Sequence, residues 1–147
     1  MSASLQPTPG PGPSVVVLED EYEALADLVC ASPRATPGIA LLWRELERAT
    51  VTPPEHAPDD LVRIGSRAYF TDLTRRESRM VRLVWPEDAL APVLVSVTSQ
   101  VGAALLGLRA GAEFEWNGPG DGPRRLRVDH VEPPPPSRTA ARRRRAG

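Results

Sequence analysis

The sequence contains no lysine, only one cysteine and few aromatic residues, and each shortage limits what the protein can be. All 18 basic residues are arginines, which we attribute to a GC-rich genome rather than to a function. Cys30 has no second cysteine with which to form an intramolecular disulfide, so a reducing, cytoplasmic compartment is expected. An aromatic content of 5% makes a large aromatic-lined pocket unexpected.

Long hydrophobic runs are also missing from the sequence. A membrane-spanning helix needs about 18 consecutive apolar residues, and no segment approaches this length. The first residues lack the basic stretch followed by an apolar stretch that is typical of a secretory signal peptide. We therefore expect no membrane partner. A hydrophobic content of 41% in 147 residues is enough for one modest core.

Charge is distributed unevenly along the chain, although the net charge is only −1. Residues 1–60 contain ten acidic residues and three arginines, whereas residues 133–147 contain five arginines and no acid. The front half is therefore not expected to meet a phosphate backbone. The block Arg142, Arg143, Arg144 and Arg145 could contact nucleic acid weakly and without sequence specificity, or it could be a solvated tail.

Two apolar stripes at helical spacing predict a short antiparallel helical hairpin in residues 15–51. The first stripe consists of Leu18, Tyr22, Leu25 and Val29, and the second of Ile39, Leu42, Leu46 and Ala49. Thr36 and Pro37 suit the N-cap and the first position of the second helix. The Pro, Gly and Ser content of residues 1–14 predicts a disordered N-terminus.

Residues 52–60 are predicted to be a linker, because their three prolines prevent the helix from continuing. From Leu61 onward the pattern changes to period two and short apolar runs, which are typical of strands. The candidate strands are 61–70, 78–85, 93–98, 112–116 and 124–131, and the one helix in this half is 101–108. The predicted fold is therefore α+β, with the hairpin followed by a twisted antiparallel sheet over residues 61–132. Residues 133–147 are expected to be a disordered Pro/Arg tail.

The segment 93–111 carries a specific order: a strand, the polar break Thr98-Ser99-Gln100, and a short apolar helix closed by Gly107. Its block Val101–Gly107, with supporting pieces at 64–68, 81–86 and 112–116, resembles the C-terminal domain of the Gre-type transcription elongation factors. This resemblance implies an FKBP-like fold for residues 61–132. It also implies RNA polymerase as the partner, bound near its secondary channel through Thr98, Ser99, Gln100 and Val101. Gln100 stands where the family has proline, and we expect it to leave the loop freer than proline would.

The predicted tip of the hairpin, Ser32, Pro33 and Arg34, departs from the Gre pattern, in which acidic residues help to hold a magnesium ion. No carboxylate lies between Cys30 and Thr36, and magnesium prefers carboxylate oxygen ligands. We therefore expect no metal, no cofactor and no stimulation of transcript cleavage, and we expect that the protein is not an enzyme. The short helices make the resemblance greatest to the Rnk subgroup, the regulators of nucleoside diphosphate kinase, and a monomer is expected.

Two alternatives remain open on the sequence. The protein could be an adaptor that acts on another partner, such as nucleoside diphosphate kinase. It could also be a prolyl isomerase of the FKBP type, although that activity needs an aromatic-walled cleft and a shared fold does not imply a shared function. The three tryptophans are interpreted as core or core-edge residues, and the two histidines as solvated or satisfied rather than metal-binding.

Overall fold

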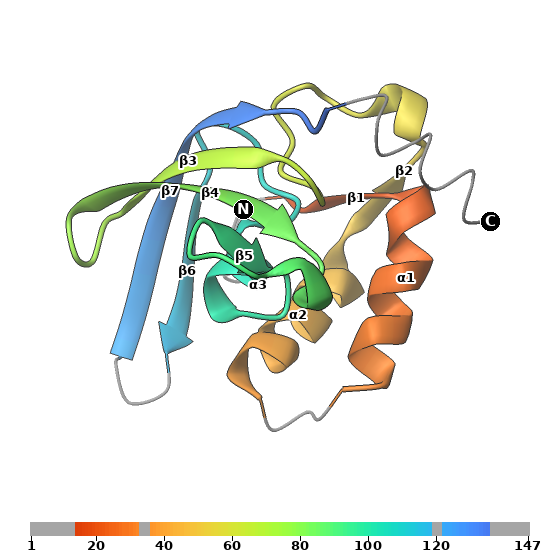
Figure 1. Cartoon of the computed structure of the whole chain (residues 1–147), viewed down its shortest axis with the longest axis horizontal. Coiled ribbons are helices and arrows are strands. Elements are labelled where there is room, and N and C mark those ends of the chain that lie inside the picture. Colours follow the sequence, from red (N-terminus) through yellow and green to blue (C-terminus); the bar gives the residue numbers. More distant parts are fainter. Residues whose placement is uncertain (1–13, 33–35, 119–121, 136–147) are drawn as a thin grey trace, which may run out of the picture.

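The computed structural model describes residues 14–32, 36–118 and 122–135. An N-terminal helical hairpin is followed by a curled sheet with a short helix inside it (Figure 1). The hairpin half comprises β1 (Val16–Leu18), α1 (Glu19–Cys30), α2 (Pro37–Arg48), β2 (Thr50–Thr52) and the 3-10 turn η2 (Pro54–His56). The second half comprises β3 (Arg67–Asp72), β4 (Glu77–Val84), the 3-10 turn η3 (Pro86–Asp88), β5 (Leu94–Ser96), α3 (Gln100–Leu105), β6 (Glu113–Gly118) and β7 (Gly122–Glu132).

The predicted helical hairpin is confirmed. Both helices contain twelve residues, and at about 1.5 Å per residue each is roughly 18 Å long. The predicted stripes face inward, with Leu25 and Val29 of α1 and Leu42 of α2 buried. Thr36 is the N-cap residue of α2 and Pro37 begins the helix, as predicted, although the Thr36 side chain forms no capping hydrogen bond.

A parallel pair of short strands joins the two ends of the hairpin; the sequence indicates an extended lead at residues 15–17 but not its pairing with a second strand. Val16 of β1 pairs with Thr50 of β2, and Leu18 pairs with Thr52, a residue that was assigned to the linker. The backbone N–H of Val16 also donates to the carbonyl of Gly107, two residues after the end of α3. Because α1 and α2 have equal length, the two strands lie together at the base of the hairpin and hold it against the second half of the chain.

The main sheet has five strands in the order β5-β4-β3-β7-β6. The expectation of a fully antiparallel sheet is wrong at one edge, where β5 runs parallel to β4. The connection between them contains η3 and brings β5 alongside the last three residues of β4, with Leu94 opposite Arg82 and Ser96 opposite Val84. The predicted strand 61–70 is also shorter than expected and begins only at Arg67, because Gly65 (φ 92°) and the Ser66 hydroxyl hold residues 61–66 in a turn.

The hydrophobic core extends from the hairpin through α3 to the inner face of the sheet. Figure 1 shows the layers in order, with α1 outermost, then α2, then α3, and the sheet curling around α3. Trp116 is buried, and Trp43 and Trp85 pack partly buried against the core, so the prediction for the tryptophans is confirmed. None of the helices in the described part of the chain is long and apolar enough to cross a membrane.

Candidate functional site

The loop that the sequence marked as a contact site is held by its own polar side chains. Ser99 is the N-cap of α3, and its Oγ accepts a hydrogen bond from the Gly102 N–H at 3.0 Å. The same hydroxyl donates to the carbonyl oxygen of Ser96 at 2.7 Å, and Ser96 Oγ in turn accepts from the Thr98 N–H at 3.0 Å. These bonds fix the turn between β5 and α3 before any partner binds.

Two glycines let other backbone segments approach this loop closely. A Cβ on Gly102 would overlap the carbonyl oxygen of Ser96, and a Cβ on Gly38 of α2 would overlap the carbonyl oxygen of Thr98. The first turn of α2 therefore packs directly on the backbone of the loop. The loop and the hairpin are consequently parts of one surface, a relationship that the sequence did not predict.

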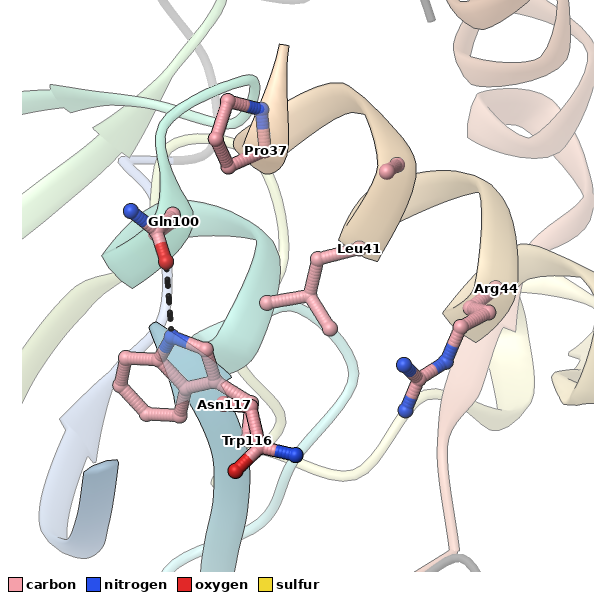
Figure 2. A pocket seen from close by; sticks show the side chains of 7 residues that line it. Pro37, Leu41, Arg44, Gln100, Trp116 and Asn117 are labelled. Atoms are coloured by element: carbon pink, nitrogen blue, oxygen red, sulfur yellow. Dashed lines mark hydrogen bonds between the residues drawn. The ribbon is translucent and has the colours of Figure 1, made fainter. Parts of the chain in front are cut away.

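Gln100 is tied to the sheet, contrary to the expectation that it would leave the loop freer. Its Oε1 accepts a hydrogen bond from the indole Nε1 of Trp116 on β6 at 3.0 Å (Figure 2). Trp116 is only 6% exposed, so this bond satisfies an indole N–H that is almost removed from water. The side chain of Gln100 thus restrains the start of α3 by a hydrogen bond, where a proline would restrain it by its ring.

A chain of polar contacts continues from Trp116 toward the β3–β4 turn. The guanidinium of Arg124 lies 5.3 Å from the centre of the Trp116 ring, and its Nη2 donates to Asp72 Oδ2 at 3.0 Å. Asp72 Oδ1 accepts from the backbone N–H groups of Thr74 and Arg75. Burial acts to raise the pKa of Asp72, but the backbone N–H of Arg75 and the Arg124 guanidinium together outweigh it and lower that pKa.

A hollow of about 230 Å³ lies beside Gln100, between α2 and β6 (Figure 2). It is lined by Pro37, Ala40, Leu41, Arg44, Gln100, Trp116 and Asn117. The four residues from α2 recur at helical spacing and form a stripe beside the one that faces the core. Leu41 and Trp116 provide a buried apolar floor, while Pro37, Ala40, Arg44 and Asn117 are exposed at the rim.

The four predicted contact residues lie together at the surface next to this hollow. Thr98, Ser99, Gln100 and Val101 are all half-buried. Two exposed apolar residues precede them in the β4–β5 connection, Leu90 (84% exposed) and Val93 (39% exposed), and the sequence reasoning did not single them out. Gly38, directly after Pro37, was a signal in the sequence that could have drawn attention to α2. Glycine destabilises a helix, so its presence there can indicate that another backbone segment approaches closely.

Of the other predicted site residues, Ser32 alone lies within the described part of the chain. Ser32 lies two residues after the end of α1, and its Oγ donates to the carbonyl of Leu28 at 2.6 Å. Pro33 and Arg34 lie outside the described residues, as do Arg142, Arg143, Arg144 and Arg145. No group of three or more His, Cys, Asp or Glu side chains in the described part of the chain is placed to hold a metal ion.

The protein has an α+β fold. A helical hairpin packs on a curled mixed sheet that contains one short internal helix. Residues 57–133 match the family model described as "Transcription elongation factor, GreA/GreB, C-term", and the chain belongs to the GreA/GreB family. Over 124 residues it is 35% identical to the "Regulator of nucleoside diphosphate kinase" of Escherichia coli K12 and of Shigella flexneri. Each match covers 82% of this chain and 90% of the relative.

A solved structure agrees with the sequence matches. The chain superimposes on the "Prokaryotic transcription elongation factor GreA/GreB from Nitrosomonas europaea" with a TM-score of 0.64 and 34% identity. The similarity covers 82% of this chain and 98% of that structure, so it includes the helical hairpin as well as the sheet. The family resemblance that the segment 93–111 indicated is therefore confirmed.

Proposed function

We propose that the protein binds RNA polymerase and regulates transcription elongation from the region of the secondary channel. The observation that carries this proposal is the restrained loop at Thr98–Val101 in a chain of the GreA/GreB family. A loop that is already ordered loses little conformational entropy when a partner binds, which favours its use as a docking element. A polymerase partner also implies a cytoplasmic location.

We further propose that the protein does not stimulate transcript cleavage and is not an enzyme. The segment between Cys30 and Thr36 at the hairpin tip contains no carboxylate with which to hold a catalytic magnesium ion. Each helix is only about 18 Å long, which limits how far the hairpin extends from the docking loop. Occupancy of the channel entrance would still exclude other factors that bind there.

Binding to purified core RNA polymerase tests the proposal. The double variant Ser99→Glu/Val101→Glu places two carboxylates on the loop and should abolish capture of the polymerase. Ser78→Glu/Met80→Glu on β4 is a matched control, because it changes a serine and an apolar residue at the same spacing in the exposed first half of that strand. Val101→Glu alone retains the Ser99 cap and distinguishes lost contact from a loosened helix start. No binding by the wild-type protein at moderate salt would refute the proposal.

The name of the 35% identical relatives favours one alternative, an adaptor that acts on nucleoside diphosphate kinase. The same capture experiment with purified nucleoside diphosphate kinase in place of the polymerase discriminates between the two functions. Weak nucleic-acid binding through Arg142–Arg145 and a monomeric state stay as predictions. A tail-truncated variant in a DNA mobility shift and a sedimentation experiment, respectively, test them.

A further inference from the structure

The hollow between α2 and β6 lies beside the loop at Thr98–Val101, and the docking contact proposed for that loop does not use it. We infer that it receives a carboxylate-bearing side chain of the partner protein, that Arg44 pairs with this carboxylate, and that the floor of the hollow covers an adjacent apolar group. This inference rests on the proposed function, since it names the chemistry of the partner surface that the loop at Thr98–Val101 would meet.

Arg44 carries the argument. It is exposed, and within the described residues its guanidinium forms no hydrogen bond or ion pair. Its acidic neighbours along α2 are engaged elsewhere: Glu45 pairs with Arg48, and Glu47 accepts a hydrogen bond from the Trp43 indole. The side chain therefore presents, at the rim of the hollow, a guanidinium with no hydrogen-bond or ion-pair partner among the described residues.

The remaining lining residues favour a protein side chain over other occupants. The floor is formed by Leu41 and the edge of Trp116, both buried, and the rim offers the amides of Gln100 and Asn117 as hydrogen-bonding groups (Figure 2). No acidic side chain lines the hollow. One cation above an apolar floor suits a single carboxylate beside an aliphatic group, whereas a nucleic-acid backbone is usually held by several cations.

The size of the hollow also favours a single side chain of a partner protein. Pockets for free small-molecule ligands usually measure about 300–1,000 Å³, and this hollow of about 230 Å³ falls below that range. It can hold one side chain of a docked protein. Gln100 lies both in the docking loop and in the wall of the hollow, so a partner that contacts the loop meets the hollow in the same interface.

Charge reversal at Arg44 tests the inference on the full chain with purified core RNA polymerase. We expect Arg44→Glu to weaken the affinity about tenfold, as truncating a central interface arginine often does. Arg44→Gln, which removes the charge but keeps hydrogen-bonding groups, should weaken it less and should flatten the dependence of affinity on salt. Arg75→Glu reverses an exposed arginine in the β3–β4 turn and should bind like the wild type. Thermal unfolding of each variant checks that the fold is intact.

The outcomes separate the inference from the proposed function. If the wild type binds, Ser99→Glu/Val101→Glu fails to bind, and Arg44→Glu binds normally, the inference is overturned while the proposed function stands. If the wild type does not bind polymerase, both are overturned. A labelled 20-nucleotide single-stranded DNA is the second probe. DNA binding that depends on Arg44, together with polymerase binding that does not, would assign the hollow to phosphate instead and would overturn the inference.

Discussion

The indole N–H of Trp116 on β6 and the side-chain carbonyl of Gln100 at the start of α3 form a 3.0 Å hydrogen bond. This single bond connects the candidate docking loop to the edge strand of the sheet. Through the ring of Trp116 it also adjoins the Arg124–Asp72 pair at the β3–β4 turn. The shape of the loop therefore depends on residues that lie far from it in the sequence.

Removing the Gln100 amide should destabilise the fold. Gln100→Ala leaves the buried Trp116 N–H without a partner, which typically costs about 1–3 kcal/mol in the free energy of unfolding. Urea denaturation measures this change. Gln100→Glu keeps an acceptor oxygen at the same place and is the control. A Gln100→Ala protein as stable as the wild type would show that the bond does not contribute.

Proline at position 100 should restore loop order by a different route. Ser99 has an extended backbone (φ −80°, ψ 162°), which is the conformation that a following proline requires, and position 100 is the first of the helix, where proline is tolerated. We expect Gln100→Pro to bind polymerase at least as well as the wild type, while Gln100→Ala binds more weakly. Titration of labelled variants with core polymerase compares the three. Binding by Gln100→Pro that is as weak as that of Gln100→Ala would contradict this expectation and would indicate that the amide itself contributes, because both variants lack it.

Gly38→Ala should be destabilising, although alanine normally favours a helix over glycine by about 1 kcal/mol. The added methyl group would overlap the carbonyl of Thr98 and force α2 away from the loop, and overpacking of this kind typically costs about 1–3 kcal/mol. Ala40→Gly, at an exposed position of the same helix, is the comparison for propensity alone. Chemical denaturation of both variants measures whether each change lowers or raises the free energy of unfolding. A stabilised Gly38→Ala protein would contradict the close packing.

The ion pair of Asp72 predicts a defined dependence of stability on pH. The pKa of this carboxyl is lowered in the folded protein from its ordinary value of 3.8, so its contribution is fully present above 3.8 and is lost as pH falls through the lower, folded-state pKa. Asp72→Asn should cost about 2 kcal/mol at pH 7, because hydrogen bonds to charged groups contribute more than neutral ones. The difference from the wild type should shrink below pH 3.8. Asp129→Asn, on a more exposed pair, should cost less. Urea titrations at several pH values measure both, and a gap that stays constant in acid would contradict this assignment.

The proposed occupancy of the channel entrance predicts competition. Added to backtracked elongation complexes alone, the protein should leave the rate of transcript cleavage unchanged. Added in excess together with a cleavage-stimulating Gre factor, it should slow that factor's cleavage, and Ser99→Glu/Val101→Glu should not. Gel analysis of the cleaved transcripts follows both reactions. Stimulation of cleavage by this protein alone would contradict the proposal, because it would show that carboxylates at the hairpin tip are not required.

The parts of the fold that depend on local patterns could be predicted from the sequence. The stripes at 18–29 and 39–49 predicted both helices, because helical periodicity is a property of neighbouring residues. The strand pair β1–β2 was not predicted, since each strand has only three residues and exists through pairing with a partner more than thirty residues away. The parallel alignment of β5 with β4 was missed for a similar reason, because orientation is decided by the path of the connection.

The candidate site was predictable only in its central segment. The polar break at Thr98–Gln100 stands out between two apolar runs and carries the family resemblance. The contributions of Gly38, Arg44 and Trp116 depend on tertiary packing between α2, α3 and β6, which no local pattern shows. Gln100 was interpreted from its residue type alone, whereas its amide oxygen accepts a hydrogen bond from Trp116, sixteen positions away.

The pairing of β1 with β2 holds both ends of the hairpin together beside Gly107. Helical turns could be inserted or removed symmetrically at the far end without displacing these anchors. The length of the hairpin depends on how many residues precede and follow the tip. The proposed attachment to the partner depends instead on the anchored base and on the loop before α3. Under the proposed function, the hairpin could therefore differ in length between relatives while the docking loop before α3 keeps the same structure.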